Sequence, residues 1–315
     1  MHRGKYFVIL QKILDMSAKN NSSGGRQSRG TQKGAPRGKA SAPKQKRDSQ
    51  KPKDKNYRPN PNKIKQFKKD SPKPSAESEN KGIRLNKYIA NAGICSRREA
   101  DTFIQSGSAS VNGKVITELG YRVQPGDEVR FDGVLISPET KRYVLLNKPK
   151  NYITTMDDEK DRKTVMELIH KATRERIYPV GRLDRMTTGL LLFTNDGEMA
   201  KKLTHPKHRV RKLYHVTLDK KLSMADLQKI SENFVLDGKM VFVDKISYIE
   251  NKPKDEVGIE IHSGRNRIVR RIFEHFGYQV TKLDRVVFAG LTKKNLPRGA
   301  WRHLAQQEVN NLKMI

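Results

Sequence analysis

Cysteine is almost absent from this chain of 315 residues. The single cysteine, Cys95, cannot form a disulfide within the chain, and it has no neighbouring ligands at the spacing of a metal site. This scarcity excludes a fold held together by internal disulfides. It favours a protein of the reducing cytoplasm, and we predict no bound metal.

Long hydrophobic runs are missing as well. The longest early apolar stretch, residues 6–10, is far shorter than the roughly 20 residues that a helix needs to cross a bilayer. It also lacks the small-residue cleavage site of a secretory signal. We therefore expect no membrane association. Met16 precedes a polar run and is an alternative start of the natural protein, so we assign no function to the first fifteen residues.

Acidic residues are few relative to basic ones. The chain has 65 Lys and Arg against 34 Asp and Glu, a net charge of +31. A surface this basic favours a polyanionic partner, with nucleic acid ahead of an anionic membrane. Low-complexity sequence dominates residues 16–79, so residues 1–82 are predicted to be a disordered basic tail, with solvated filler as the alternative to a binding role. Without that tail the chain still carries a net charge of +15.

The first ordered region is predicted over residues 83–140. Apolar residues at helical spacing predict a helix over residues 83–93. Ser96 and Glu99 match a capping box and therefore begin a second helix. An Asn-Gly pair at residues 112–113 predicts a tight hairpin. Together these signals predict a small αβ module.

Four motifs of this module resemble the RNA-binding domain first recognised in the small-subunit ribosomal protein S-four. They are Arg84-Leu-Asn-Lys87, Ser96-Arg-Arg-Glu-Ala100, Val111-Asn-Gly-Lys114 and Pro125-Gly-Asp127. The resemblance implies that the cations of the module contact the phosphates of a folded RNA. These cations are Arg84, Lys87, Arg97, Arg98 and Lys114. The alternative is that they are ordinary solvated residues.

The second region, residues 141–315, alternates strands and helices without a strict βαβ rhythm. It therefore predicts an α+β domain with a mostly antiparallel or mixed sheet flanked by helices. Its most informative loop carries Asp184 between Arg182 and Arg185, at the ends of apolar strands. Two neighbouring arginines favour the ionised carboxylate that a nucleophile requires. Taken alone, an Asp between two Arg is more often half of a surface ion pair.

The segment from Gly181 to Gly197 resembles the signature of the RsuA/RluB/RluF group of pseudouridine synthases. Three further segments agree with that group in order and spacing: Leu146-Asn-Lys-Pro149, Arg211-Lys-Leu-Tyr-His-Val216 and Gly264-Arg-Asn-Arg-Ile-Val-Arg-Arg271. The resemblance covers residues 83–303. It implies an enzyme that isomerises a uridine of RNA to pseudouridine, with Asp184 as the nucleophile and a base that leaves the stack to react.

The resemblance also implies roles for residues far from Asp184 in the chain. Tyr214 would pack against the uracil, Arg270 would pair with Asp184, and both complete a catalytic trio. Strand alternation places Tyr214, Val216 and Leu218 on one face, and helical spacing makes Arg267, Arg270 and Arg271 project together from one face of a helix. Without the resemblance, Tyr214 is an ordinary strand tyrosine and Arg270 a phosphate contact. The expected RNA contacts of this region are Arg182, Arg185, Arg267 and Arg271, of which Arg182 could fill the place of the flipped base. Ile268 departs from the group, which often has Gln there.

These expectations lead to one predicted function and two alternatives. We predict a monomer that acts without cofactor on ribosomal RNA or a ribosome-assembly intermediate, with large-subunit 23S RNA ahead of small-subunit RNA and transfer RNA. One rival is a non-enzymatic protein of ribosome assembly that only binds RNA. Another is a basic DNA-binding protein, which would bind duplex DNA and folded RNA with comparable affinity.

Overall fold

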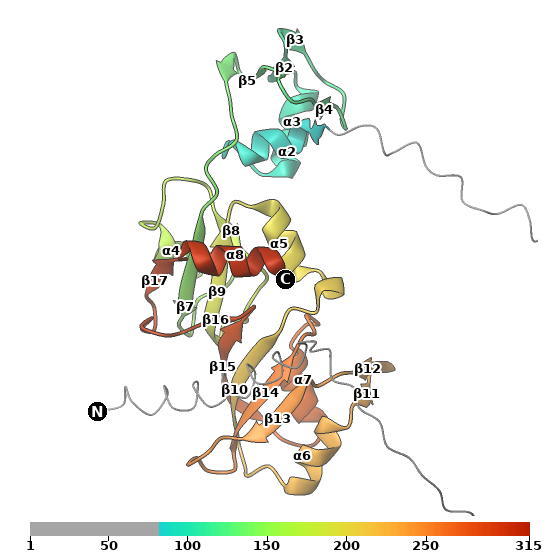
Figure 1. Ribbon diagram of the computed structural model, residues 1–315, viewed down its shortest axis with the longest axis vertical. Helices are drawn as coiled ribbons and strands as arrows, with labels where there is room; N and C mark the ends of the chain where they lie inside the picture. The colour runs from blue at the N-terminus through green and yellow to red at the C-terminus, as the bar shows by residue number, and fades with distance from the viewer. Residues whose placement is uncertain (1–81) are drawn as a thin grey trace, which may run out of the picture. The chain divides into compact units, whose positions relative to one another are not determined.

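The computed structural model describes residues 82–315, and Figure 1 shows their arrangement. The predicted basic tail and the alternative start at Met16 lie outside the described residues. Among residues 82–315, no helix is both long enough and apolar enough to cross a membrane.

The N-terminal part combines two short helices with two small sheets. Its elements are β1 (Ile83–Arg84), α2 (Leu85–Asn91), α3 (Arg97–Gln105), β2 (Ala109–Val111), β3 (Lys114–Val115), β4 (Arg122–Val123), β5 (Val129–Phe131) and β6 (Val134–Leu135). The predicted capping box is confirmed, because the Ser96 amide donates to Glu99 Oε2 at 2.6 Å and the Glu99 amide to Ser96 Oγ at 3.3 Å. The predicted hairpin is confirmed too, with Asn112 and Gly113 both at positive φ. The first helix is shorter than predicted, because β1 pairs with β4.

The larger part is built on one mixed sheet. Its main path runs β13-β14-β10-β15-β9-β7-β17, while β8 pairs with β9 and β16 with β15. The strands are β7 (Tyr143–Lys148), β8 (Tyr178–Pro179), β9 (Thr188–Thr194), β10 (Lys212–Leu218), β13 (Lys245–Tyr248), β14 (Glu256–Ile261), β15 (Val280–Phe288), β16 (Leu291–Thr292) and β17 (Trp301–His303). The pairs are antiparallel except β15 with β9. This arrangement confirms the predicted α+β fold.

Helices pack on both halves of this sheet. They are α4 (Val165–Ile169), α5 (Gly197–Thr204), α6 (Met224–Ser231), α7 (Ile268–His275) and α8 (Gln306–Met314), together with the short 3-10 helix η1 (Pro206–His208) and the hairpin β11 (Phe234–Leu236)–β12 (Lys239–Val241). One core cluster joins α6 and α7 to β10, β13 and β14, and two others join α4, α5 and α8 to β7 and β9. The parallel contact between β9 and β15 therefore connects two separately packed halves.

Gly189 permits that contact. Its φ is +109°, and a Cβ at this position would lie 2.3 Å from the Arg285 carbonyl oxygen and 2.5 Å from the Arg285 amide nitrogen. Such distances are far below any van der Waals contact, and backbone atoms inside a sheet cannot move aside. Only glycine fits where the two paired backbones approach this closely.

We expect Gly189→Ala to lower the free energy of unfolding by about 3 kcal/mol or more, through backbone strain and steric overlap. Urea unfolding of the purified protein measures this loss. Gly120→Ala is the matched control, because Gly120 has a similar φ of +98° but no atom within 4 Å of its missing Cβ. Equal losses in the two variants would show that the close approach of β15 does not matter.

Candidate active site

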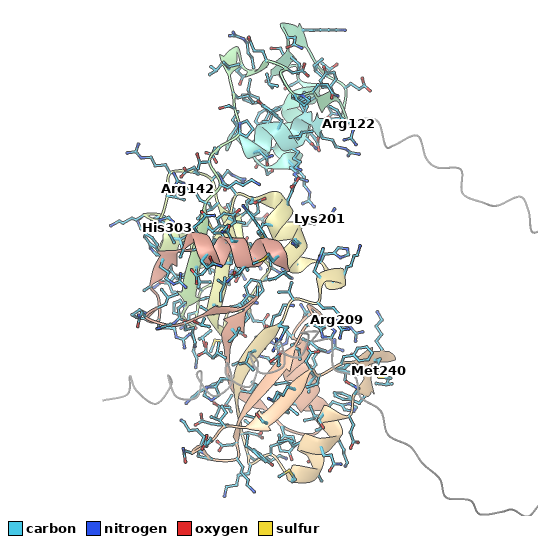
Figure 2. The ribbon with its side chains drawn as sticks, viewed as in Figure 1. Arg122, Arg142, Lys201, Arg209, Met240 and His303 are labelled. Carbon is cyan, nitrogen blue, oxygen red and sulfur yellow. The ribbon has the colours of Figure 1, made fainter. Side chains whose placement is uncertain are left out.

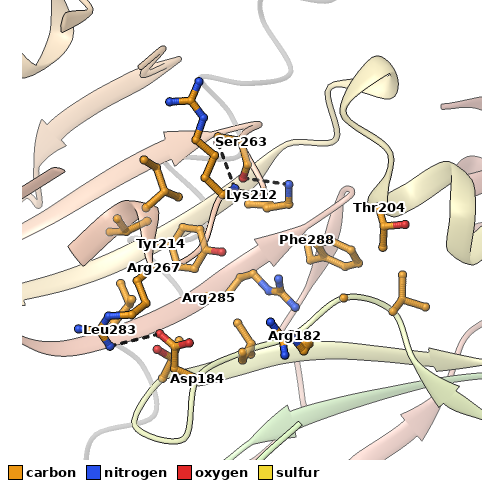
Figure 3. A pocket seen from close by; sticks show the side chains of 18 of the residues that line it. Arg182, Asp184, Thr204, Lys212, Tyr214, Ser263, Arg267, Leu283, Arg285 and Phe288 are labelled. Carbon is orange, nitrogen blue, oxygen red and sulfur yellow. Dashed lines mark hydrogen bonds and ion pairs between the residues drawn. The ribbon is translucent and has the colours of Figure 1, made fainter. Parts of the chain in front are cut away.

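A pocket of about 190 Å³ lies at the junction of the two halves of the sheet (Figure 3). Its walls come from the loop before β9, from β10 and β15, and from the loop that leads into α7. The charged residues that line it are Arg182, Asp184, Lys212, Arg265, Arg267 and Arg285. A single carboxylate thus faces five cations, which makes the pocket suited to an electron-rich or anionic ligand.

Asp184 lies on the loop between β8 and β9, where the sequence placed it. Its side chain is 39% exposed, so the carboxylate can reach a ligand in the pocket. The Thr187 amide donates to the Asp184 carbonyl at 3.0 Å, which closes a turn directly after the carboxylate.

Lys148, the last residue of β7, holds the loop that carries Asp184 in place by hydrogen bonds. Its side chain is fully buried, and Nζ donates to the carbonyls of Asp184 at 3.1 Å, Arg185 at 3.3 Å and Thr187 at 2.8 Å. Burial lowers the pKa of Lys148 to about 8, although the charge of Asp184 opposes this effect. At neutral pH the amine is therefore still protonated, with three N–H donors for the loop. Sequence reasoning treated Lys148 only as part of a motif, although a lysine inside an apolar strand was a signal.

The ion pair of Asp184 differs from the predicted one. Asp184 Oδ2 lies 3.8 Å from Arg267 Nη1, whereas Arg270 donates its Nη1 to the Val280 carbonyl at 2.7 Å. Burial lowers the pKa of Arg270, the neighbouring Arg267 adds to this, and Asp184 opposes it. The charge of Asp184 therefore acts on Arg270 without a direct ion pair. The structure therefore gives Asp184 the ion-pair partner Arg267 in place of the predicted Arg270.

The predicted common face of three arginines on α7 is also wrong. Arg267 precedes the helix in a left-handed conformation with φ 47°, which turns it toward Asp184. Arg270 is half-buried against β15, and Arg271 forms an ion pair with Asp237 of the β11–β12 hairpin. The helical spacing was right, but the irregular first residue and the neighbouring elements separate the three side chains.

Tyr214 lies across the pocket from the Asp184 loop. It is 9% exposed and faces the same core as Val216 and Leu218, which confirms the predicted shared face of β10. Figure 3 shows its ring in the pocket wall, between Arg267 and Phe288. A flat aromatic wall beside a carboxylate suits a planar ligand that stacks.

Two family models match the chain: RNA pseudouridylate synthase over residues 142–275 and the S4 domain over residues 83–129. The ribosomal large subunit pseudouridine synthase B of Bacillus subtilis is 40% identical over 240 residues, which is 74% of this chain and 96% of the relative. The chain belongs to the RNA pseudouridine synthase family. The dual-specificity RNA pseudouridine synthase RluF of Escherichia coli is 36% identical and covers 73% of this chain and 78% of its own.

A solved structure supports the same family. The crystal structure of a pseudouridylate synthase matches with a TM-score of 0.53 at 28% identity, covering 73% of this chain and 99% of its own. The protein is therefore an RNA pseudouridine synthase with an N-terminal S4 domain, and it isomerises uridine to pseudouridine.

The S4 domain of this pseudouridine synthase presents the cations that the sequence singled out. Arg84, Arg97, Arg98 and Lys114 are exposed, whereas Lys87 is half-buried. On the catalytic part, Arg182 and Arg185 are exposed beside Asp184, but only Arg182 lines the pocket.

Sequence reasoning missed several cations of the synthase near the pocket. Arg265 is exposed and lines it. Lys201 on α5 and Arg209 just after η1, both labelled in Figure 2, are exposed on the segment that contributes Leu203 and Thr204 to the pocket. The dense run of basic residues around 201–212 was a signal that composition alone could have supplied.

The Ile268 side chain, at the position where the resemblance led us to expect Gln, is 6% exposed and belongs to the core cluster under α7. It also lines the pocket, so this part of the wall is apolar. Within residues 82–315, no group of three or more His, Cys, Asp and Glu side chains is arranged to hold a metal ion.

Proposed function

We propose that this synthase isomerises a single uridine of large-subunit ribosomal RNA, with Asp184 as the nucleophile. The observation that carries this proposal is the placement of Asp184, which within the described part of the chain is the only carboxylate lining a cationic pocket with an aromatic wall. The RNA assignment rests on the Bacillus subtilis relative, whose name specifies the large ribosomal subunit, at 40% identity.

In the proposed reaction the target nucleotide leaves its stack and enters the pocket. Tyr214 packs against the uracil and holds it beside Asp184. The Asp184 carboxylate adds to the nucleotide, the uracil is detached and turned, and C5 bonds to the ribose in place of N1. Arg182 takes the place of the flipped base in the RNA, since its planar cation can stack or donate hydrogen bonds.

Arg267 and Arg270 complete the catalytic group in this proposal. Arg267 balances the charge of Asp184 before the nucleotide binds. Arg270 acts through its field on Asp184, and it approaches the carboxylate when the nucleotide displaces Arg267. Arg185 and Arg271 bind phosphates on either side of the site.

We further propose that residues 83–140 deliver the catalytic domain, residues 141–315, to folded RNA. The S4 domain would bind backbone phosphates through Arg84, Lys87, Arg97, Arg98 and Lys114, so affinity should fall steeply with salt. The predicted tail, residues 1–82, would add nonspecific attraction to the ribosomal particle. The enzyme would act in the cytoplasm as a monomer, without a cofactor, because a carboxylate nucleophile supplies the chemistry.

Mapping pseudouridines in ribosomal RNA from cells with and without the gene tests the substrate. We expect one large-subunit position to revert to uridine in the deletion strain and to be restored by the wild-type gene. Restoration by the Asp184→Asn gene would contradict the catalytic assignment. A lost site in small-subunit RNA or transfer RNA would contradict the proposed substrate.

A further inference from the structure

Arg285 is the most deeply buried cation of the pocket. The residue is 3% exposed, its Nε donates to the Leu190 carbonyl at 2.8 Å, and its guanidinium lies 4.4 Å from the ring centre of Phe288. Its Nη2 is buried without a hydrogen-bond partner. A buried donor without a partner destabilises the fold, and a ligand that accepts a hydrogen bond from it would remove this cost.

Unpaired buried groups gather at this pocket. Among residues 82–315, the buried side-chain atoms without a partner are Thr187 Oγ1, Arg270 Nε and Arg285 Nη2. Thr187 and Arg285 line the pocket. Arg285 stands directly opposite Tyr214 across the β10–β15 pair, and Figure 3 shows its guanidinium between Tyr214 and the loop of Arg182 and Asp184.

No carboxylate of the pocket balances the charge of Arg285. Among residues 82–315, Asp184 is the only acidic residue that lines the pocket, and its ion pair is with Arg267. Burial lowers the pKa of Arg285, and Tyr214 counters this effect, so the phenol lies close enough to interact with the cation. An acceptor with partial or full negative charge is therefore the ligand that would stabilise this side chain most.

The surroundings favour a base over a phosphate. A phosphate remains attached to a solvated backbone, and the exposed cations Arg182, Arg265 and Arg267 suit it. Arg285 instead lies beside the rings of Tyr214 and Phe288, where a flat base can stack and present a carbonyl oxygen.

We propose that Arg285 is a catalytic residue that donates from Nη2 to a carbonyl oxygen of the target uracil and stabilises the negative charge of the detached base. The inference rests on the proposed function, because it assumes a uridine held beside Asp184. It adds a recognition element for the base and a group that lowers the barrier to its detachment.

Detachment of uracil creates the charge that Arg285 would stabilise. The C1′–N1 bond breaks with its electron pair on N1, and the base becomes an anion whose charge spreads over O2 and O4. An oxygen of the Asp184 carboxylate bonds to the electron-deficient ribose carbon, C1′. When C5 bonds to C1′, the carboxylate leaves, the proton on C5 is released and N1 gains a proton. The product is an isomer of the substrate, so no other reactant is needed.

The test compares Arg285→Gln and Arg285→Lys with wild type in single-turnover reactions at saturating RNA fragment. Removal of one donor that stabilises developing charge costs about 10²–10³-fold in rate, and we expect this loss for Arg285→Gln with RNA affinity unchanged within about threefold. Arg285→Lys keeps the positive charge, so its rate should be at least about tenfold higher than that of Arg285→Gln. Arg302→Gln is the matched control, since Arg302 is a half-buried arginine held by Glu308 and does not line the pocket.

A second substrate tests whether Arg285 stabilises the negative charge of the detached base. 5-Fluorouridine at the target position releases 5-fluorouracil, whose anion is more stable than that of uracil, so the base needs less help to leave. The loss of 5-fluorouridine reports C1′–N1 cleavage. The loss of single-turnover rate in Arg285→Gln should be at least about tenfold smaller with this substrate than with uridine. If Arg285→Gln does not fold, as thermal unfolding would reveal, Arg285→Lys carries the same comparison.

Two results would overturn the proposal. One is an equal deficit on uridine and 5-fluorouridine, which would indicate a role in positioning Tyr214 or β9. The other is a weakened, salt-dependent RNA affinity with an unchanged saturated rate, which would indicate a phosphate contact. Failure of the proposed function itself is distinguishable, because wild type would then form no pseudouridine.

Discussion

Asp184→Asn is expected to abolish pseudouridine formation. The amide keeps the shape of the side chain but removes the charge and the nucleophilic oxygen, so the single-turnover rate should fall by at least about 10⁴-fold. RNA affinity should be equal or slightly higher, because one negative charge leaves a cationic pocket. The rate is measured on a transcribed fragment of large-subunit RNA, and affinity by filter binding of the same fragment.

Asp158→Asn provides the matched control. Asp158 is likewise held by an arginine, Arg162, but on a loop that does not line the pocket. Its rate should stay within about twofold of wild type, because Asp158 and its ion pair lie outside the pocket. If Asp184→Asn kept more than about 1% of the wild-type rate, Asp184 would not be the nucleophile.

Lys148→Met is expected to slow the reaction by about 10²-fold, because Lys148 acts through the loop that carries Asp184 and not through contact with RNA. Methionine fills the volume but donates nothing, so the carbonyls of Asp184, Arg185 and Thr187 lose their shared partner. A displacement of the carboxylate by about 1 Å is enough for a loss of this size. The free energy of unfolding should fall by about 2–4 kcal/mol, because buried carbonyls are left unpaired.

The measurement separates positioning from stability. Single-turnover rates at saturating RNA are compared at a temperature where wild type, Lys148→Met and Lys252→Met are all folded. Lys252 is a partly buried lysine that pairs with Glu256 and does not line the pocket, so its loss should leave the rate unchanged. A destabilised Lys148→Met enzyme with the wild-type rate would show that Lys148 supports the fold but does not position the nucleophile.

The contrast between Asp184 and Lys148 shows what sequence patterns reveal. Asp184 stood out because a carboxylate between two arginines fits a motif of adjacent residues. Lys148 acts through contacts with a loop that follows far along the chain, and its partners are backbone carbonyls. A lysine inside an apolar strand signals a buried cation, but residue types do not show which backbone carbonyls it binds.

The arginines of the α7 region show a related limit. Helical periodicity placed Arg267, Arg270 and Arg271 correctly near one helix, but it assumed a regular helix from the start. The positive φ of Arg267 and the neighbouring β15 and β11–β12 hairpin send the three side chains to different partners. Periodicity carries no information about such an irregular residue or about neighbours from other elements.

The sequence by itself determined the family, the α+β fold and the identity of Asp184 and Tyr214 as site candidates, because these rest on local motifs and strand or helix periodicity. Only the tertiary structure decided that Arg267 pairs with Asp184, that Lys148 holds the loop and that Arg285 reaches the pocket. These contacts join segments remote in the chain, as does the parallel pair of β9 and β15, where Gly189 lets two backbones meet. Distances between segments remote in the chain arise from packing, which no local pattern encodes.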